Sequence, residues 1–91
     1  MTVQVVLPGV LADLAGGAKH LDREPGTLAE VLDGLAAEHP LLGRRIRDET
    51  GALRRFVNVY VDGDDVRFGD GLDTAVRDGA VVQVLPSVAG G

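Results

Sequence analysis

The chain has 91 residues, which is enough for one hydrophobic core and too few for two, so a second catalytic lobe is excluded. A formal net charge of -5 disfavours nucleic-acid binding, because phosphate backbones attract positive surfaces. The absence of cysteine excludes disulfides, thiolate metal sites and a cysteine nucleophile.

The first half of the chain predicts a hairpin followed by one main helix. Val3, Val5 and Leu7 alternate with their neighbours, which indicates a half-buried first strand, and residues 18–22 can close a hairpin with it after a loop or short turn at residues 11–17. Thr27 and Glu30 have the spacing of a capping box, and an apolar stripe from Leu28 to Ala36 runs until His39-Pro40 ends the helix.

The second half predicts three strands joined by turns. A further helical turn is expected around Leu42 and Ile46. Residues 56–61 form the clearest strand, with Val57, Val59 and Val61 expected to face the helix. After the turn at Asp62-Gly63 we expect a short strand at residues 64–68, a helical turn at residues 72–76 and a last strand at residues 81–85, which Pro86 ends.

This order of elements predicts an α+β fold of the β-grasp type. A mixed sheet of four to five strands should be covered on one face by the main helix. We expect residues 1–85 to form the ubiquitin-like domain and residues 86–91 to form a flexible C-terminal tail ending in Gly-Gly. The chain shows no apolar run of the roughly 20 residues that cross a bilayer and no basic leader pattern, which predicts a cytoplasmic protein.

Side chains with catalytic or metal-binding chemistry are scattered along the chain. His20 and His39 have no partner at helical ligand spacing, so no metal site is expected. Asp62, Asp64 and Asp65 lack the glycine and glutamate spacing of a calcium loop, and a hairpin turn explains them better. The basic cluster of Arg44, Arg45, Arg47, Arg54 and Arg55 is interrupted by Asp48 and Glu49 and is expected to form a solvated loop.

The C-terminal residues offer a different chemistry. Six residues beyond the last strand could reach about 20 Å, enough to place a terminal carboxylate in the active site of another protein. Gly90 and Gly91 have no side chains, so a narrow tunnel could admit them. Adenylation by ATP would turn the Gly91 carboxylate into an electrophile that a sulfur donor converts into a thiocarboxylate. A frayed end is the alternative interpretation of the two glycines.

The chain resembles the MoaD/ThiS family of sulfur carriers in three stretches, and within it the CysO type associated with cysteine biosynthesis. These stretches are Phe56-Val57-Asn58-Val59-Tyr60-Val61, Asp78-Gly79, and Leu85-Pro86-Ser87-Val88-Ala89-Gly90-Gly91. The resemblance implies a β-grasp carrier that is not itself an enzyme and binds no cofactor. It also implies an E1-like adenylyltransferase or sulfurtransferase partner that uses ATP to activate Gly91. A sulfur-accepting synthase would follow, which in the CysO branch is a cysteine synthase using phosphoserine, and a metalloprotease would trim the adduct.

The partner-binding surface is expected on the sheet face opposite the helix, beside the origin of the tail. Phe56, Tyr60, Val81 and Leu85 should form an apolar cluster there, continued by Pro86, Val88 and Ala89; cover within the fold is the alternative. Two other functions share the same fold: the small subunit of molybdopterin synthase, and a ubiquitin-like modifier that joins Gly91 to target lysines.

Overall fold

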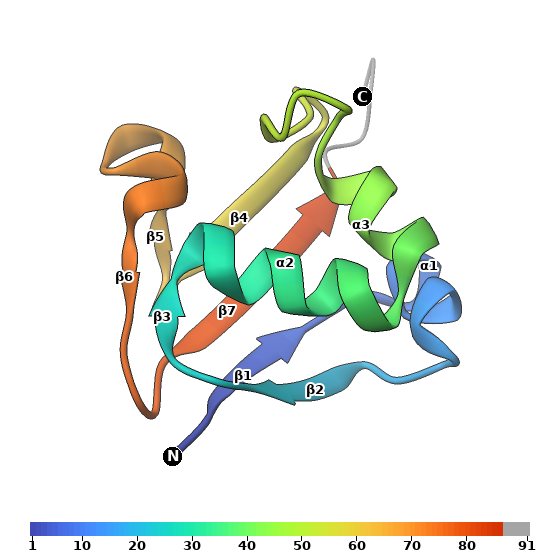
Figure 1. The fold of residues 1–91 in the computed structure, drawn as a ribbon, viewed down its shortest axis with the longest axis horizontal. Coiled ribbons are helices and arrows are strands. Elements are labelled where there is room, and N and C mark those ends of the chain that lie inside the picture. The colour runs from blue at the N-terminus through green and yellow to red at the C-terminus, as the bar shows by residue number, and fades with distance from the viewer. Residues whose placement is uncertain (87–91) are drawn as a thin grey trace.

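A five-stranded mixed sheet forms the frame of the chain, of which the computed structural model describes residues 1–86. The strand order is β2-β1-β7-β4-β5, with β1 and β7 parallel and the other neighbours antiparallel (Figure 1). The strands are β1 (Val3–Val6), β2 (His20–Arg23), β4 (Val57–Val61), β5 (Asp64–Asp65) and β7 (Val81–Pro86).

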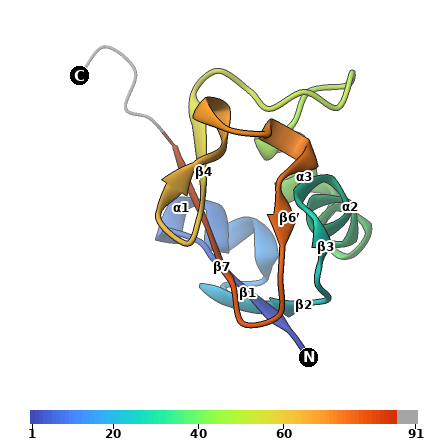
Figure 2. The same cartoon turned by 90° about the vertical axis from the view of Figure 1, so that its left-hand side faces the viewer.

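Helix α2 (Leu28–Glu38) lies across one face of this sheet (Figures 1 and 2). It leads into α3 (Pro40–Ile46), and the short α1 (Gly9–Ala12) runs into a 3₁₀ helix, η1 (Asp13–Ala15). The predicted α+β fold of the β-grasp type, with a mixed sheet and one main helix, is confirmed. No helix among residues 1–86 has both the length and the apolar content that crossing a bilayer requires.

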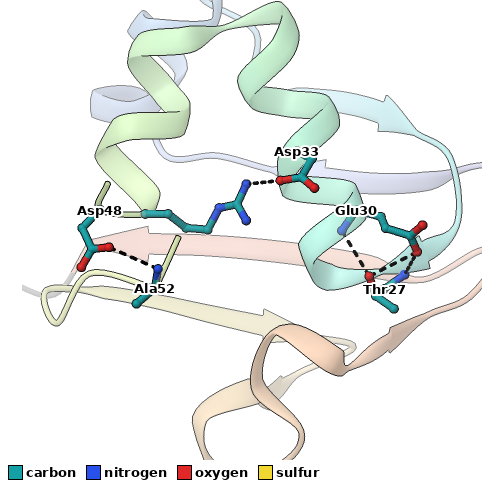
Figure 3. Close-up of polar contacts among 6 residues, drawn as sticks. Thr27, Glu30, Asp33, Asp48 and Ala52 are labelled. Carbon is teal, nitrogen blue, oxygen red and sulfur yellow. Dashed lines mark hydrogen bonds and ion pairs between the residues drawn. The ribbon is translucent and has the colours of Figure 1, made fainter. Parts of the chain in front are cut away.

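The predicted capping box starts α2. The Glu30 N–H donates to Thr27 Oγ1 at 3.2 Å, and the Thr27 N–H donates to Glu30 Oε1 at 2.9 Å (Figure 3). These two bonds satisfy amide groups that the first turn of a helix leaves without partners. The helix ends at Glu38, before His39-Pro40, as the sequence predicts.

The core lies between α2 and the inner face of the sheet. The apolar stripe of α2 is buried at Leu28, Val31, Leu32 and Leu35. The inner-facing valines of the two central antiparallel strands are buried against it: Val57, Val59, Val61, Val82 and Val84. The predicted orientation of the β4 valines towards the helix is therefore confirmed.

A close approach of two backbones holds α3 against α2. A Cβ added at Gly43 would lie 2.5 Å from the Ala36 Cβ, so the helices meet where α3 has no side chain. Across the sheet edge, the Arg23 guanidinium lies over Gly34 and forms an ion pair with Glu38. The glycine inside α2 thus makes room for an arginine from β2.

The arginine-rich segment after α3 is ordered by local hydrogen bonds. Arg47 Nη2 lies 2.6 Å from Asp33 Oδ1 on α2, and Asp48 Oδ1 accepts from the Ala52 N–H at 3.2 Å (Figure 3). The Thr50 hydroxyl and N–H also donate to Asp48, at 2.6 and 2.8 Å. The two Thr50 bonds, together with the smaller effects of the Ala52 bond and the Arg54 charge, hold the pKa of the Asp48 carboxyl below its usual value.

Several element boundaries differ from the prediction because side-chain caps and strand pairing decide where each element begins and ends. The expected strand at residues 64–68 is only β5, since the Asp65 carboxylate caps a 3₁₀ helix, η2 (Val66–Phe68). The expected helical turn at residues 72–76 is split between the 3₁₀ helix η3 (Gly71–Asp73) and β6 (Ala75–Val76), which pairs with β3 (Gly26–Thr27). The second strand lies at His20–Arg23, displaced from residues 18–22 by its register with β1.

Candidate functional site

The last strand of the sheet leads directly to the C-terminal segment that the sequence marks as reactive. Strand β7 is central, and residues 81–83 pair with β1 while residues 82–86 pair with β4. Residues 84–86, which we call the tail root, therefore extend beyond the end of the β1 pairing and are held by β4. Pro86 belongs to β7 opposite Val57, so the strand includes one residue more than predicted. A proline at this last position interrupts no later step of the ladder.

The tail itself lies outside the described residues. The predictions for Val88, Ala89, Gly90 and Gly91, together with the tail that contains them, stay predictions. What residues 1–86 provide is a hydrogen-bonded base, because the chain enters that segment from the middle of the sheet.

The outer face of the sheet carries two of the predicted docking residues beside the tail root. Leu85 pairs with Asn58, and Tyr60 pairs with Gln83, so Leu85 and Tyr60 are diagonal neighbours on adjacent strands. Such pairs lie about 7–8 Å apart, within reach of an aromatic side chain. Leu85 and Tyr60 are both partly exposed, so this part of the outer face is not covered by the fold. Pro86 is also partly exposed, but it lies opposite the inward-facing Val57 and so belongs to the other face of the sheet.

Contrary to the prediction, Val81 does not lie beside the tail root. It shares the outer face and is 38% exposed, but it begins β7 whereas Pro86 ends it. Five residue steps along a strand separate them by about 17 Å. Val81 is instead held by the turn after β4, where its N–H donates to Asp62 Oδ1 at 2.9 Å.

Phe56 is also displaced from the predicted cluster. It precedes β4 and has no place in the strand pairing. It is 45% exposed and lines a cavity of about 390 Å³ with Leu14, Leu41, Arg44, Arg45 and Arg54. The position of Phe56 was predicted wrongly because the alternation of side chains applies only within the extended strand, and Phe56 precedes β4.

Sequence reasoning missed Val6 as a member of the outer face. Val6 is partly exposed and pairs with Gln83, next to the tail root. The signal was present in the alternation of β1, where an apolar residue falls in line with the polar Gln4. The outer apolar surface near the tail root therefore consists of Val6, Tyr60 and Leu85.

The acidic turns have structural roles. Asp62 (φ 51°) and Gly63 (φ 89°) both have positive φ, which matches the tight hairpin turn expected between β4 and β5. The Asp78 carboxylate accepts the Thr2 N–H at 3.0 Å. Within residues 1–86, no three His, Asp or Glu side chains gather as a metal site would require.

Comparison with known proteins agrees with this architecture. The ThiS family model matches residues 5–91. Sulfur carrier protein CysO of Mycobacterium tuberculosis is 43% identical over 93 aligned residues that cover all of both chains. Small archaeal modifier protein 3 of Haloferax volcanii is 44% identical over 69 residues, which cover 75% of this chain and 73% of that protein.

Solved structures extend the similarity to the fold. The crystal structure of Mycobacterium tuberculosis CysO has a TM-score of 0.87 at 41% identity and covers 94% of this chain and 99% of that chain. A chain of the Amycolatopsis orientalis BexX/CysO complex has a TM-score of 0.84 at 39% identity and covers 98% of this chain and 99% of that chain. With its ubiquitin-like β-grasp fold and a family match over nearly its whole length, the chain belongs to the ThiS family.

Proposed function

We propose that this chain is a sulfur carrier whose C-terminal Gly91 is adenylated and then converted into a thiocarboxylate. The observation that supports it is the tail root, which extends beyond β1 at the centre of the sheet and ends five residues before Gly91. Full-length similarity to CysO sulfur carriers supports thiocarboxylate chemistry at the end of this tail.

The proposed reaction takes place in the active site of a partner enzyme. A Gly91 carboxylate oxygen attacks the α-phosphorus of ATP, and pyrophosphate leaves. A hydrosulfide donor then attacks the carbonyl carbon of the acyl adenylate, its proton goes to solvent, and AMP leaves with the bridging oxygen. The carrier supplies the carboxylate and the docking surface, while we propose that ATP is held by an E1-like partner. The carrier is thus a co-substrate and not a catalyst.

The outer apolar surface offers a binding site for such a partner. Tyr60 and Leu85 of this surface lie near the base of the tail, as does Pro86 at the end of β7, so an enzyme that admits Gly91 meets them first. A partly exposed aromatic residue with an aliphatic neighbour is typical of the anchors that dominate protein interfaces. Because β7 is paired along its length, docking would present the tail without first having to order its base.

We further propose that the thiocarboxylate delivers sulfur to the biosynthesis of cysteine or another metabolite in the cytoplasm. Its acceptor would be a synthase, and a metalloprotease would release the product from the adduct. Similarity to CysO proteins supports this choice over the small subunit of molybdopterin synthase.

The test is intact-mass analysis after incubation with the activating enzyme, ATP and a sulfide donor. We expect exchange of one oxygen for sulfur at Gly91 in the wild-type chain. Deletion of Gly91 should abolish the exchange, and a matched variant with one alanine appended after Gly91 should also be inactive. Exchange that persists in either variant would overturn the proposal.

A modifier function is the second candidate, favoured by the 44% identity to small archaeal modifier protein 3. In that case, Gly91 would form isopeptide bonds with lysines of other proteins. Under the same conditions with a cell extract added, ladders of adducts that depend on Gly91 would support the modifier. The carrier predicts the sulfur exchange in purified components and no ladders.

A further inference from the structure

An exposed aromatic residue, Phe68, lies outside the outer apolar surface. Phe68 ends the 3₁₀ helix η2 and is 91% exposed. Folded chains usually withdraw a phenylalanine side chain from water at least in part, so a nearly complete exposure calls for an explanation. Mobility of the loop could explain this exposure, but the hydrogen bonds around Phe68 indicate that the turn is held in place.

The residues on both sides of Phe68 are firmly anchored. Val66 is buried in the core, and its carbonyl accepts the Gly69 N–H at 3.1 Å. Asp65 Oδ1 accepts the Arg67 N–H at 2.9 Å. The Arg67 guanidinium donates to Asn58 Oδ1 on β4 at 2.9 Å and to the Arg54 carbonyl, which precedes that strand, at 2.5 Å. Phe68 is therefore presented to solvent by a turn that is fixed at several points.

This turn lies at the same end of the sheet as the tail root. Arg67 binds Asn58, and Asn58 pairs with Leu85, one residue before Pro86. Neighbouring strands are about 5 Å apart, so β5, which leads into η2, lies roughly 10 Å from β7 across β4. A protein that binds the tail can therefore also contact Phe68.

The surroundings of Phe68 are strongly acidic. Residues 62–73 contain five aspartates and one arginine, Arg67, whose guanidinium is bonded to β4. Beside the turn, a cavity of about 340 Å³ is lined by Asp62, Asp64, Asp65 and Asp70, with Arg77 as its one cationic lining residue. A surface complementary to this region has an apolar pocket for the ring and lysine or arginine side chains around it.

We propose that Phe68 is a docking anchor for the enzyme that activates Gly91, inserting into an apolar pocket with a basic rim. This inference rests on the proposed function and adds a second contact to it, separate from Tyr60 and Leu85. The aspartates around Phe68 steer the approach, and the ring supplies an apolar contact that persists at high salt.

The test is calorimetric binding to the E1-like enzyme of the same organism, without ATP. Phe68→Ala should raise the dissociation constant about 10- to 100-fold, as removal of an aromatic anchor does. Leu41→Ala is the matched control: Leu41 is 63% exposed and belongs to α3, which lies across the molecule from β5 in Figure 1, and the variant should change the constant less than about twofold. The double variant Asp64→Asn with Asp70→Asn should bind more weakly at low salt and with a smaller salt dependence.

The possible outcomes separate this inference from the function on which it rests. If the wild-type chain undergoes sulfur exchange while Phe68→Ala binds the enzyme as tightly as wild type, the inference alone is wrong. If sedimentation shows that wild type dimerises and Phe68→Ala does not, with enzyme binding unchanged, Phe68 joins two carriers and the inference is again wrong. If the wild-type chain neither binds nor exchanges sulfur, both proposals fall together.

Discussion

The two faces of the sheet use the same strands for opposite purposes. On the face covered by α2, Val82 and Val84 of β7 are fully buried against the helix. On the outer face, the neighbouring Gln83 is exposed and Leu85 is half-buried, with α2 on the other side of the sheet. Alternation along one strand thus places consecutive residues in the core and on the exposed face. Substitutions on the outer face should therefore have little effect on the core.

The largest effect is expected from placing a charge on the covered face. Val84→Asp would bury an uncompensated carboxylate and should lower the free energy of unfolding by about 4 kcal/mol. Urea unfolding followed by circular dichroism measures this change. Gln83→Asp, one residue away on the exposed face, is the control and should lower it by less than about 0.5 kcal/mol. Equal losses in the two variants would contradict the assignment of the faces.

A smaller loss is expected where α2 and α3 touch. In Gly43→Ala, the new methyl group would collide with Ala36, and separating the two helices should cost about 1–3 kcal/mol. Gly34→Ala is the control, because the Arg23 side chain over Gly34 can move and alanine favours the helix by about 1 kcal/mol. Thermal unfolding should show a lower midpoint for the first variant and little or no loss for the second.

The start of α2 tests how much the covering helix depends on local bonds. Thr27→Ala removes the acceptor of the Glu30 N–H and should cost about 1 kcal/mol. Thr27→Ser keeps the hydroxyl and should retain most of the stability. Chemical denaturation of both variants distinguishes loss of the cap from a general effect of substitution at this position, which would lower both alike.

On the outer face, Leu85→Ala should change stability and function by different amounts. Because Leu85 is half-buried, we expect a loss below about 1 kcal/mol in the free energy of unfolding. Binding to the activating enzyme should weaken about tenfold if Leu85 is an anchor. Gln83→Ala serves as the matched control on the same face. Unchanged binding in Leu85→Ala would remove Leu85 from the docking surface.

The smallest effect is expected in the dependence of stability on acidic pH. The hydrogen bonds from Thr50 lower the pKa of Asp48 from its usual 3.8, so the ionised carboxylate is favoured in the folded chain. Its contribution to stability is present above pH 3.8 and is lost as the pH falls through the lower folded value. Asp48→Asn keeps an acceptor oxygen but lacks the charge, so its stability should approach that of wild type as the pH drops. A constant difference between them from pH 6 to pH 2.5 would contradict this sign.

Much of the fold could be predicted because its signals are local. The capping box at Thr27, the stripe of α2 and the alternation of β4 each depend on residues within one element, and all are confirmed. The same logic failed where a side chain bonds across elements or the chain stops being extended. Asp65 ends β5 by capping η2, and Phe56 escapes the alternation of β4 because it precedes the strand. The exposure of Phe68 gave no signal in the sequence, where Val66 and Phe68 alternate with Arg67 like the core side of a strand.

Periodicity and motifs within short stretches of the chain were enough to predict the helix, the central valine-rich strands, the fold class and the family resemblance. Local patterns could not predict which residues share the outer face beside the tail root or which aromatic residue faces solvent. The physical reason is that strand register and the Arg67 bonds to Asn58 and Arg54 join residues far apart in the chain, and no local pattern encodes that pairing.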